Sequence, residues 1–204
     1  MPPAMTDLDF LASVELKSVL YGLDRMWHGL KFRASWEARA KQEADTIALV
    51  RGTYKLVEAS TGVPWPVIGV IHQLEGGGSF KAHLHNGDPL TDYTRNVPRN
   101  RPMLGHEPPF SWEESAIDAL RFDGLTKRRD WTSAAVVLDT LERFNGLGYR
   151  KRHIASPYLW SGSTHYSKGK FTSDGRFSAS AVSKQVGAAL VLKQLERMGM
   201  LLLK

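Results

Sequence analysis

The chain has 204 residues, a formal net charge of +6 and a sequence pI near 9.6, and 42% of its residues are hydrophobic. This composition is typical of a globular protein that can bury a substantial core, and it argues against extensive disorder. Because the chain contains no cysteine, a disulfide framework and a thiolate metal site are both excluded. The basic balance favours an anionic partner, and nucleic acid, an anionic membrane or an anionic cell wall would each fit.

The first residues lack a basic start followed by an apolar run, and no stretch approaches the roughly 20 apolar residues of a membrane span. We therefore expect no membrane span, and a protein made in the cytoplasm without a signal peptide that reaches a target outside the cell after release or export. The basic clusters at 127–129 and 150–152 are not interleaved with aromatic residues as in a groove for single-stranded nucleic acid. We expect no specific nucleic-acid partner.

The N-terminal third predicts helices. Residues 1–30 have a modest amphipathic pattern that indicates a short helix or two, and apolar residues over 35–60 recur at threes, fours and sevens, which predicts one long core helix. The apolar run 67–75 follows, and we interpret it as a buried helix because its isoleucines and its leucine share a face and the glycines 76–78 supply a stop. This interpretation places Glu75 on the last helical turn.

The middle of the chain is less regular. Residues 79–110 contain a strong Asn-Gly-Asp-Pro turn and four further prolines, so they predict loop and short strand. Ser111 and Glu114 have the spacing of a capping box for a helix that runs to about Leu120.

Two more helices are predicted near the C-terminus, over about 130–145 and 178–198. The fold class is therefore mainly α. We expect an α+β, lysozyme-like arrangement in which a helical lobe and a small irregular or β lobe form a cleft. An N-terminal helical part over 1–62 and a catalytic part over 63–204 would make one compact domain.

Two motifs resemble those of a known superfamily. The segment 72–80, His-Gln-Leu-Glu-Gly-Gly-Gly-Ser-Phe, resembles the catalytic helix end of goose-type lysozymes and lytic transglycosylases, and 141–149 looks like their second motif, a helix that ends in aromatic-Asn-small-Gly. The stretch 63–194 also resembles phage-type and bacterial endolysins, through 83–91 and 156–162. The resemblance implies a monomeric muramidase without a cofactor that cleaves the MurNAc–GlcNAc β-1,4 bond of bacterial peptidoglycan.

Glu75 is the predicted catalytic acid. A glycosidic oxygen leaves only when it is protonated, so the acid must hold its proton near neutral pH, and apolar neighbours would raise its pKa accordingly. Hydrolysis also requires a group that activates water, and Asp88 with Thr94 six residues later has the carboxylate-to-hydroxyl spacing of inverting phage lysozymes. The thirteen positions from Glu75 to Asp88 exceed the connection in that family, and Thr91 and Asp92 are the nearby alternatives if Asp88 is only a turn residue.

The same resemblance suggests substrate-binding residues. Asn145 would face the cleft from the end of its helix and bind an N-acetyl or hydroxyl group. Tyr149, Tyr158 and Trp160 would offer ring faces on which sugars stack, the last two from a loop bounded by a proline and a glycine. His85 completes this predicted set.

Three alternatives remain at this point. His83 and His85 would share a face on an extended strand and, with Asp88, His72 or His106, would suit a zinc-dependent wall peptidase or amidase. A noncatalytic module that binds the wall or nucleic acid would explain the charge alone. A lytic transglycosylase would need only the glutamate, because the substrate's own hydroxyl replaces water.

Overall fold

The computed structural model describes residues 7–127, 129–173 and 175–204, and their side chains from residue 12 onward. The described residues are mainly helical with one small two-stranded sheet, which confirms the predicted fold class at that level. The elements run in the order α1 (Asp7–His28), α2 (Ala34–Leu49), α3 (Arg51–Thr61), α4 (Trp65–Gly76), α5 (Trp112–Phe122), α6 (Ala134–Asn145), a 3-10 turn η1 (Arg150–Arg152), α7 (Pro157–Trp160), β1 (Lys170–Ser173), β2 (Arg176–Ser178) and α8 (Ala188–Arg197).

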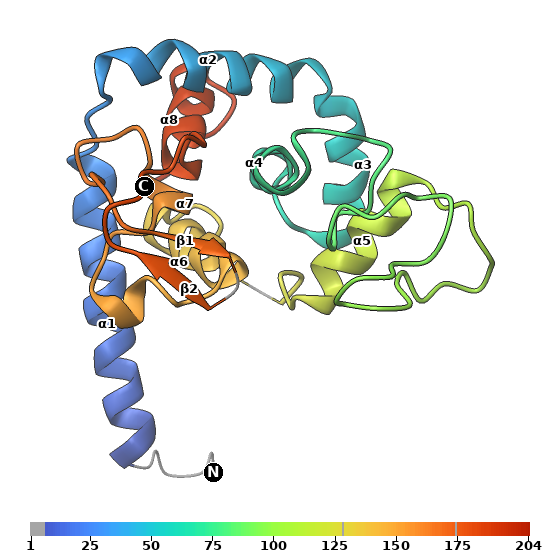
Figure 1. The fold of residues 1–204 in the computed structure, drawn as a ribbon, viewed down its shortest axis with the longest axis horizontal. Helices are drawn as coiled ribbons and strands as arrows, with labels where there is room; N and C mark the ends of the chain where they lie inside the picture. The colour runs from blue at the N-terminus through green and yellow to red at the C-terminus, as the bar shows by residue number, and fades with distance from the viewer. Residues whose placement is uncertain (1–6, 128, 174) are drawn as a thin grey trace.

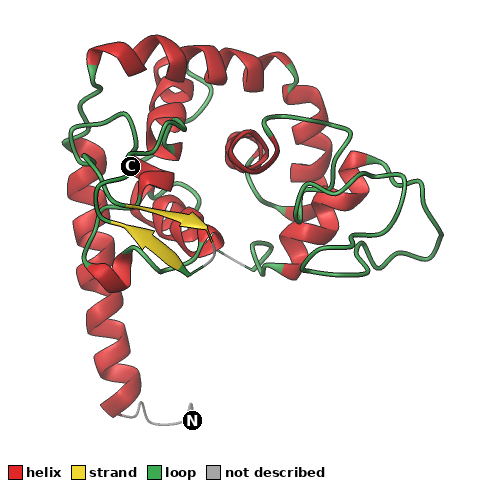
Figure 2. Ribbon diagram, viewed as in Figure 1, coloured by secondary structure: helices red, strands yellow, loops and turns green. Residues whose placement is uncertain are grey.

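The molecule has two halves, and α4 lies between them (Figure 1). One half contains α1, α6, α7, α8 and the sheet; the other contains α3, α5 and the long loop 77–111. Helix α4 packs against α3 on one side and against α8 on the other, while α2 crosses above and contacts both α4 and α8. Figure 2 shows that both strands belong to the first half, so the second consists of helices and loop. None of the described helices is long and apolar enough to cross a membrane.

Helix α4 is buried over almost its whole length because nearly all its side chains are apolar. Pro66 lies in its first turn, where the missing N–H costs no helical hydrogen bond. Gly69 allows α2 to cross closely, since a Cβ at this position would lie 2.4 Å from a methyl group of Ile47. Gly77, with φ of 59°, ends the helix in the left-handed conformation that glycine adopts without strain. Helix α4 is therefore buried along most of its length and reaches the surface at Glu75.

Helix α5 has the predicted capping box. The Ser111 hydroxyl accepts a hydrogen bond from the Glu114 amide, and the Glu114 carboxylate accepts one from the Ser111 amide in return. The helix buries Trp112 and Leu120 against a hydrophobic core that is continuous across both halves of the molecule.

Three elements differ from the sequence prediction. The expected long helix over 35–60 is two helices that meet at Val50, whose φ of −103° and ψ of 19° leave the helical region. The expected C-terminal helix from residue 178 begins only at Ala188, and Val182, expected to be buried, is 53% exposed. Tyr158 and Trp160 lie in the short helix α7 rather than in a loop.

Packing explains the first two differences. The apolar pattern continues through Val50, but α2 packs on α4 and α8 while α3 packs on α4 and α5, so the two pieces need different directions. Gly187 is the N-cap residue of α8, and its backbone packs closely against α7. A Cβ at this position would lie 2.4 Å from the Leu159 carbonyl oxygen, so only glycine fits there.

Candidate active site

Glu75 lies on the last turn of α4, as predicted, and a buried histidine fixes that turn. His72 Nδ1 is 3.0 Å from the Tyr54 hydroxyl and Nε2 is 3.0 Å from the Ser79 carbonyl. Burial lowers the pKa of His72, so the ring is neutral: Nε2–H donates to Ser79, and Nδ1 accepts from Tyr54. The glycine turn that follows Glu75 is thus held against the helix from which it emerges.

An aromatic cluster anchors the same helix end to the second half of the molecule. The His72 ring centroid lies 4.4 Å from that of Trp112 on α5 and 4.8 Å from that of Phe80 in the loop. Tyr54 on α3 packs edge-on against Trp112 at 5.6 Å. Four aromatic rings from α3, α4, α5 and the loop therefore fix the place where Glu75 reaches the surface.

The Glu75 side chain is open to solvent yet surrounded by protein, as expected for a residue in a cleft. Its pKa is raised, first because the surrounding protein desolvates the carboxylate. Interaction with the Tyr158 hydroxyl lowers the pKa, and the negative charge of Asp123 raises it again. The net effect favours the protonated acid.

Tyr158 approaches Glu75 from α7 in the other half of the molecule. Its ring is 6% exposed, and its buried hydroxyl has no hydrogen-bond partner of normal geometry within the described chain. Burial and the charge of Glu75 raise the pKa of Tyr158 well above its ordinary value, so the hydroxyl stays protonated. The contact with Glu75 is therefore longer or less well aligned than a normal hydrogen bond, and the hydroxyl is available to donate one.

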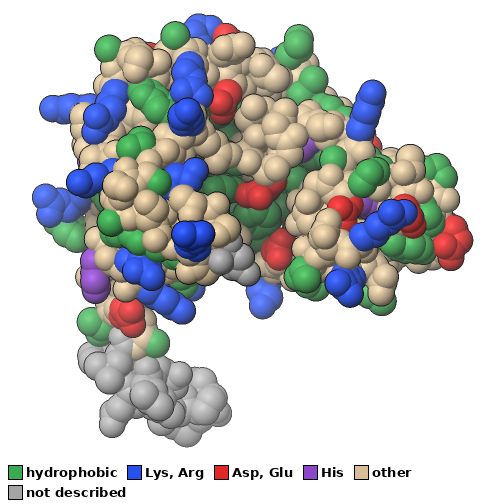
Figure 3. Space-filling view, in the orientation of Figure 1, with side chains coloured by type: hydrophobic (Ala, Val, Ile, Leu, Met, Phe, Trp, Pro, Cys, Tyr) green, Lys and Arg blue, Asp and Glu red, His purple; other side chains and the backbone are tan. Residues whose placement is uncertain are grey.

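Asp123 is a second carboxyl group beside Glu75, and the sequence reasoning missed it. It is the C-cap residue of α5, and its side chain is open to solvent. Desolvation by the surrounding protein raises its pKa, while the positive charge of Arg101 opposes the shift. Figure 3 shows acidic side chains gathered in the hollow between the two halves. Two carboxyl groups at the C-terminal ends of α4 and α5 thus have raised pKa values, and the charge of one acts on the other.

A groove leads away from Tyr158 along the sheet. A pocket of about 130 Å³, lined partly by Tyr158 and Gln185, opens into one of about 550 Å³, and the two share Asn145, Tyr149 and Phe171. Gln185 Nε2 also donates to the Leu74 carbonyl at 2.7 Å, which joins this groove to the end of α4. The groove therefore adjoins the end of α4 that carries Glu75.

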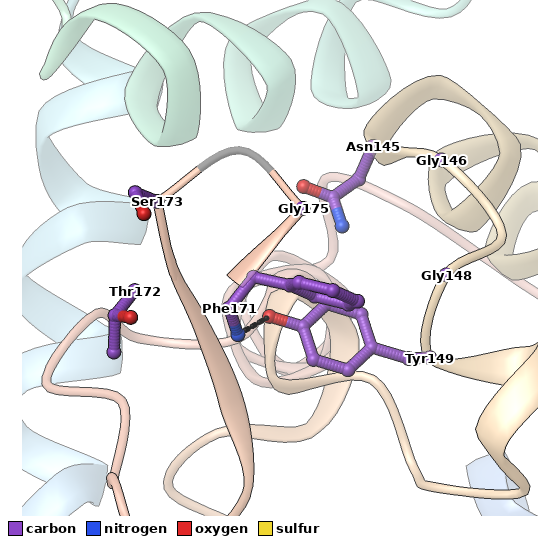
Figure 4. A pocket seen from close by; sticks show the side chains of 8 residues that line it. All are labelled: Asn145, Gly146, Gly148, Tyr149, Phe171, Thr172, Ser173 and Gly175. Atoms are coloured by element: carbon purple, nitrogen blue, oxygen red, sulfur yellow. Dashed lines mark hydrogen bonds between the residues drawn. The ribbon is translucent and has the colours of Figure 1, made fainter. Parts of the chain in front are cut away.

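Two of the predicted binding residues lie in this groove. Figure 4 shows the Asn145 amide pointing into the space that the Tyr149 and Phe171 rings border. The Asn145 side chain is exposed and makes no hydrogen bond within the part of the chain that is described. The Tyr149 hydroxyl accepts a hydrogen bond from the Phe171 amide at 3.1 Å, which fixes the ring at the groove floor.

The structure does not bring Asp88 and Thr94 to Glu75. The Asp88 carboxylate accepts hydrogen bonds from the side chains of Asn86 and Asn96 and from the backbone amides of Arg95 and Asn96. These bonds lower its pKa. Thr94 is buried, donates to the Pro98 carbonyl and accepts from the Arg101 amide. Both side chains hold their own loop together, which replaces the catalytic role predicted for them.

Asp92 and Thr91, the nearby alternatives to Asp88, show no link to Glu75 either. Asp92 accepts from the Tyr93 amide and forms an ion pair with Arg95 at 2.7 Å, and Thr91 is exposed. Neither contributes to the charges that act on Glu75.

His85 and Trp160 are structural residues, contrary to the prediction. The His85 side chain is 0% exposed and lies 2.8 Å from Asp118, which also binds Arg101. Trp160 is 1% exposed and packs edge-on against His165. Neither ring can therefore stack on a sugar.

The histidines proposed as zinc ligands form hydrogen bonds with other protein groups. His83 contacts the Ser115 hydroxyl and the Asp92 carbonyl, each at 2.8 Å, and His106 contacts Glu114 at 2.9 Å. Among the described residues, no group of three or more His, Cys, Asp or Glu side chains is placed to hold a metal ion.

Comparisons with protein-family models, with curated proteins and with solved structures find no significant match to this chain. Glu75, Asp123, Tyr158 and the adjoining groove are the features of the molecule that indicate a function.

Proposed function

We propose that the protein is a peptidoglycan-degrading glycoside hydrolase of the muramidase type, which cleaves the β-1,4 bond between MurNAc and GlcNAc with Glu75 as general acid. The observation that carries this proposal is the position of Glu75, a solvent-exposed carboxyl group with a raised pKa on the last turn of a buried helix that lies between the two halves of the molecule. A leaving sugar oxygen requires a proton donor of this kind.

The neighbours of Glu75 support the role. Desolvation and the charge of Asp123 both favour the protonated acid before the reaction. Once the proton has moved to the glycosidic oxygen, the Tyr158 hydroxyl can donate a hydrogen bond to the carboxylate that forms, because it has no other partner in the described structure. The site would thus stabilise the protonated acid before the proton transfer and the carboxylate after it.

Asp123 takes the place that sequence reasoning gave to Asp88. In an inverting hydrolase the second carboxylate orients a water molecule on the opposite face of the sugar from the acid. Asp123 is open to solvent, lies near enough to raise the pKa of Glu75, and belongs to a different helix.

Lytic transglycosylation is the second candidate. It is favoured by the involvement of Asp88 and Thr94 in loop structure, which leaves Glu75 with a single carboxyl neighbour in place of the predicted carboxylate-hydroxyl pair. The two reactions share the first proton transfer and differ in their product ends, which are reducing sugars after hydrolysis and 1,6-anhydro sugars after transglycosylation.

The test is a Glu75→Gln substitution, with digestion of purified peptidoglycan followed by mass analysis of the fragments. Because the amide has nearly the same shape but cannot donate the proton, activity should fall by about 10²–10⁴-fold. Glu15→Gln, on an exposed position of α1, is the matched control and should retain full activity.

Retention of more than about a tenth of the wild-type rate by Glu75→Gln would contradict the general-acid role. If the wild-type protein binds peptidoglycan but releases no fragment, the noncatalytic wall-binding alternative replaces the enzyme.

A further inference from the structure

The whole formal net charge of the protein comes from one segment. Residues 146–187, which we call the basic segment, contain seven Lys and Arg residues and a single acidic residue, so this segment carries +6. The rest of the chain has twenty basic and twenty acidic residues and is neutral. The basic segment forms η1, α7, β1 and β2, and several of its residues line the groove beside Tyr158.

Most of these cations have no acidic partner among the residues that the structure describes. Arg150 forms ion pairs with Asp139 and Glu142 on α6. The other six make no ion pair within the described chain: Lys151, Arg152, Lys168, Lys170, Arg176 and Lys184. Arg152 is fixed over the rings of Phe171 and Phe177, at 5.7 and 4.7 Å, and so serves the sheet.

Lys170 differs from the other five by its place. It is the first residue of β1 and lines the 130 Å³ pocket together with Tyr158 and Gln185. No other Lys or Arg lines either part of the groove in the described chain. The charge that acts on Glu75 is that of Asp123, so Lys170 is not the ionic partner of the proposed acid. Lys170 is half-buried and has no acidic partner among the described residues, so its ammonium group can take an anion from a ligand in the groove.

We propose that Lys170 binds a carboxylate group on the peptide substituent of the glycan strand and thereby selects peptidoglycan over neutral glycans. This inference rests on the proposed function and adds a specificity-determining residue to it. A neutral polysaccharide presents only hydroxyl and amide groups, which Asn145 and Gln185 can bind, and it gives Lys170 no ionic partner. A glycan strand that carries peptides places carboxylates beside its sugars. The flexible Lys170 side chain can reach such a carboxylate, because Lys170 lines the same pocket as Tyr158, the residue that interacts with Glu75.

The test measures binding and does not depend on turnover. In a Glu75→Gln background, the affinity for soluble glycopeptide fragments of peptidoglycan is compared with that for the same fragments after amidation of their carboxylates and with that for neutral chitooligosaccharides. Lys170→Gln should weaken binding of the unmodified fragments by about fivefold, the amount expected of a partly exposed ion pair, and should leave binding of the other two ligands unchanged. Lys168→Gln is the matched control, because it removes the same charge from a neighbouring pocket.

The outcomes separate this inference from the proposed function. If no glycan ligand binds, the proposed function fails, and the role of Lys170 fails with it. If all three ligands bind and Lys170→Gln behaves as Lys168→Gln does, the carboxylate site is wrong and the proposed function stands.

Two further anionic ligands test whether Lys170 binds phosphate groups in place of carboxylates. Wall polymers rich in phosphate, or duplex DNA, would overturn the proposal if their binding depends on Lys170 more strongly than that of the glycopeptides does.

Discussion

Glu75 and Asp123 both have raised pKa values, and the negative charge of Asp123 contributes to the shift at Glu75. The surrounding protein desolvates both carboxyl groups, and the charge of Asp123 adds to the pKa of Glu75. Desolvation and like-charge repulsion act in the same direction on an acid, so Glu75 holds its proton to a higher pH than a free glutamate does. Asp123 has Arg101 nearby, which offsets part of its shift and favours Asp123 as the group that ionises first.

This pair predicts a bell-shaped dependence of kcat/KM on pH. Activity should rise as Asp123 loses its proton and fall at higher pH as Glu75 loses its own. In Asp123→Asn the repulsion is gone, so the pKa of Glu75 should fall and the alkaline limb of the profile should move to lower pH. A pH-rate profile of both proteins, together with NMR titration of the Glu75 carboxyl group, measures this shift.

Asp88→Asn is the control for that experiment, because its carboxylate is bound within the distant part of the loop. Its profile should keep the wild-type limbs. An alkaline limb that stays in place in Asp123→Asn would show that Asp123 does not act on Glu75.

At the scale of elements, α7 and α8 control the position of Tyr158. Gly187 lies between them, and a Cβ at this position would lie 2.4 Å from the Leu159 carbonyl oxygen and 2.7 Å from the Ser161 amide nitrogen. Gly187→Ala should therefore force α7 away from α8 and lower the free energy of unfolding by about 1–3 kcal/mol, as overpacking does. Activity should fall as well, because Tyr158 moves with α7.

The matched control is Gly22→Ala on α1, where a new Cβ meets no atom within 4 Å. Alanine inside a helix is favoured over glycine, so this variant should gain about 0.5–1 kcal/mol. Urea unfolding of both variants measures the two effects, and a Gly187→Ala protein as stable as the wild type would contradict the close contact between α7 and α8.

Local signals were predicted well where the element itself contains them. The Ser111–Glu114 capping box and the glycine stop after Glu75 depend on neighbouring residues, and both appear in the structure. The break at Val50 and the late start of α8 depend on what each segment packs against, which hydrophobic periodicity does not reveal. The aromatic residue Trp160 shows the same limit, because its burial results from distant parts of the fold.

The candidate site follows the same division. Glu75 was predicted because its helix end and its glycine turn are adjacent in sequence. Asp123 was missed because only the fold places its charge where it acts on Glu75, and an aspartate after a helix gives no separate functional signal. Asp88 was proposed from spacing alone, and spacing does not show that its carboxylate already has four hydrogen-bond donors.

At the scale of the whole molecule, the net charge predicts how the enzyme responds to salt. The Debye length is about 10 Å at 0.1 M salt, so screening weakens attraction between the basic segment and an anionic wall. We expect kcat/KM on intact peptidoglycan to fall several-fold between about 0.02 and 0.3 M salt, while turnover of a neutral chitooligosaccharide stays nearly constant. Equal salt dependence for both substrates would indicate an effect on the protein itself.

The uneven distribution of charge should also orient the protein as it approaches an anionic surface. All of the excess positive charge lies in residues 146–187, and acidic side chains lie in the hollow between the two halves, so we expect the protein to have an electric dipole. The field of an anionic surface would exert a torque on this dipole before any contact forms and would turn the basic segment toward the surface. Since Tyr158 of that segment adjoins Glu75, the mouth of the cleft turns with it. Collisions with such a surface would therefore occur mainly with the cleft facing it, and fewer encounters would be lost to unproductive orientations.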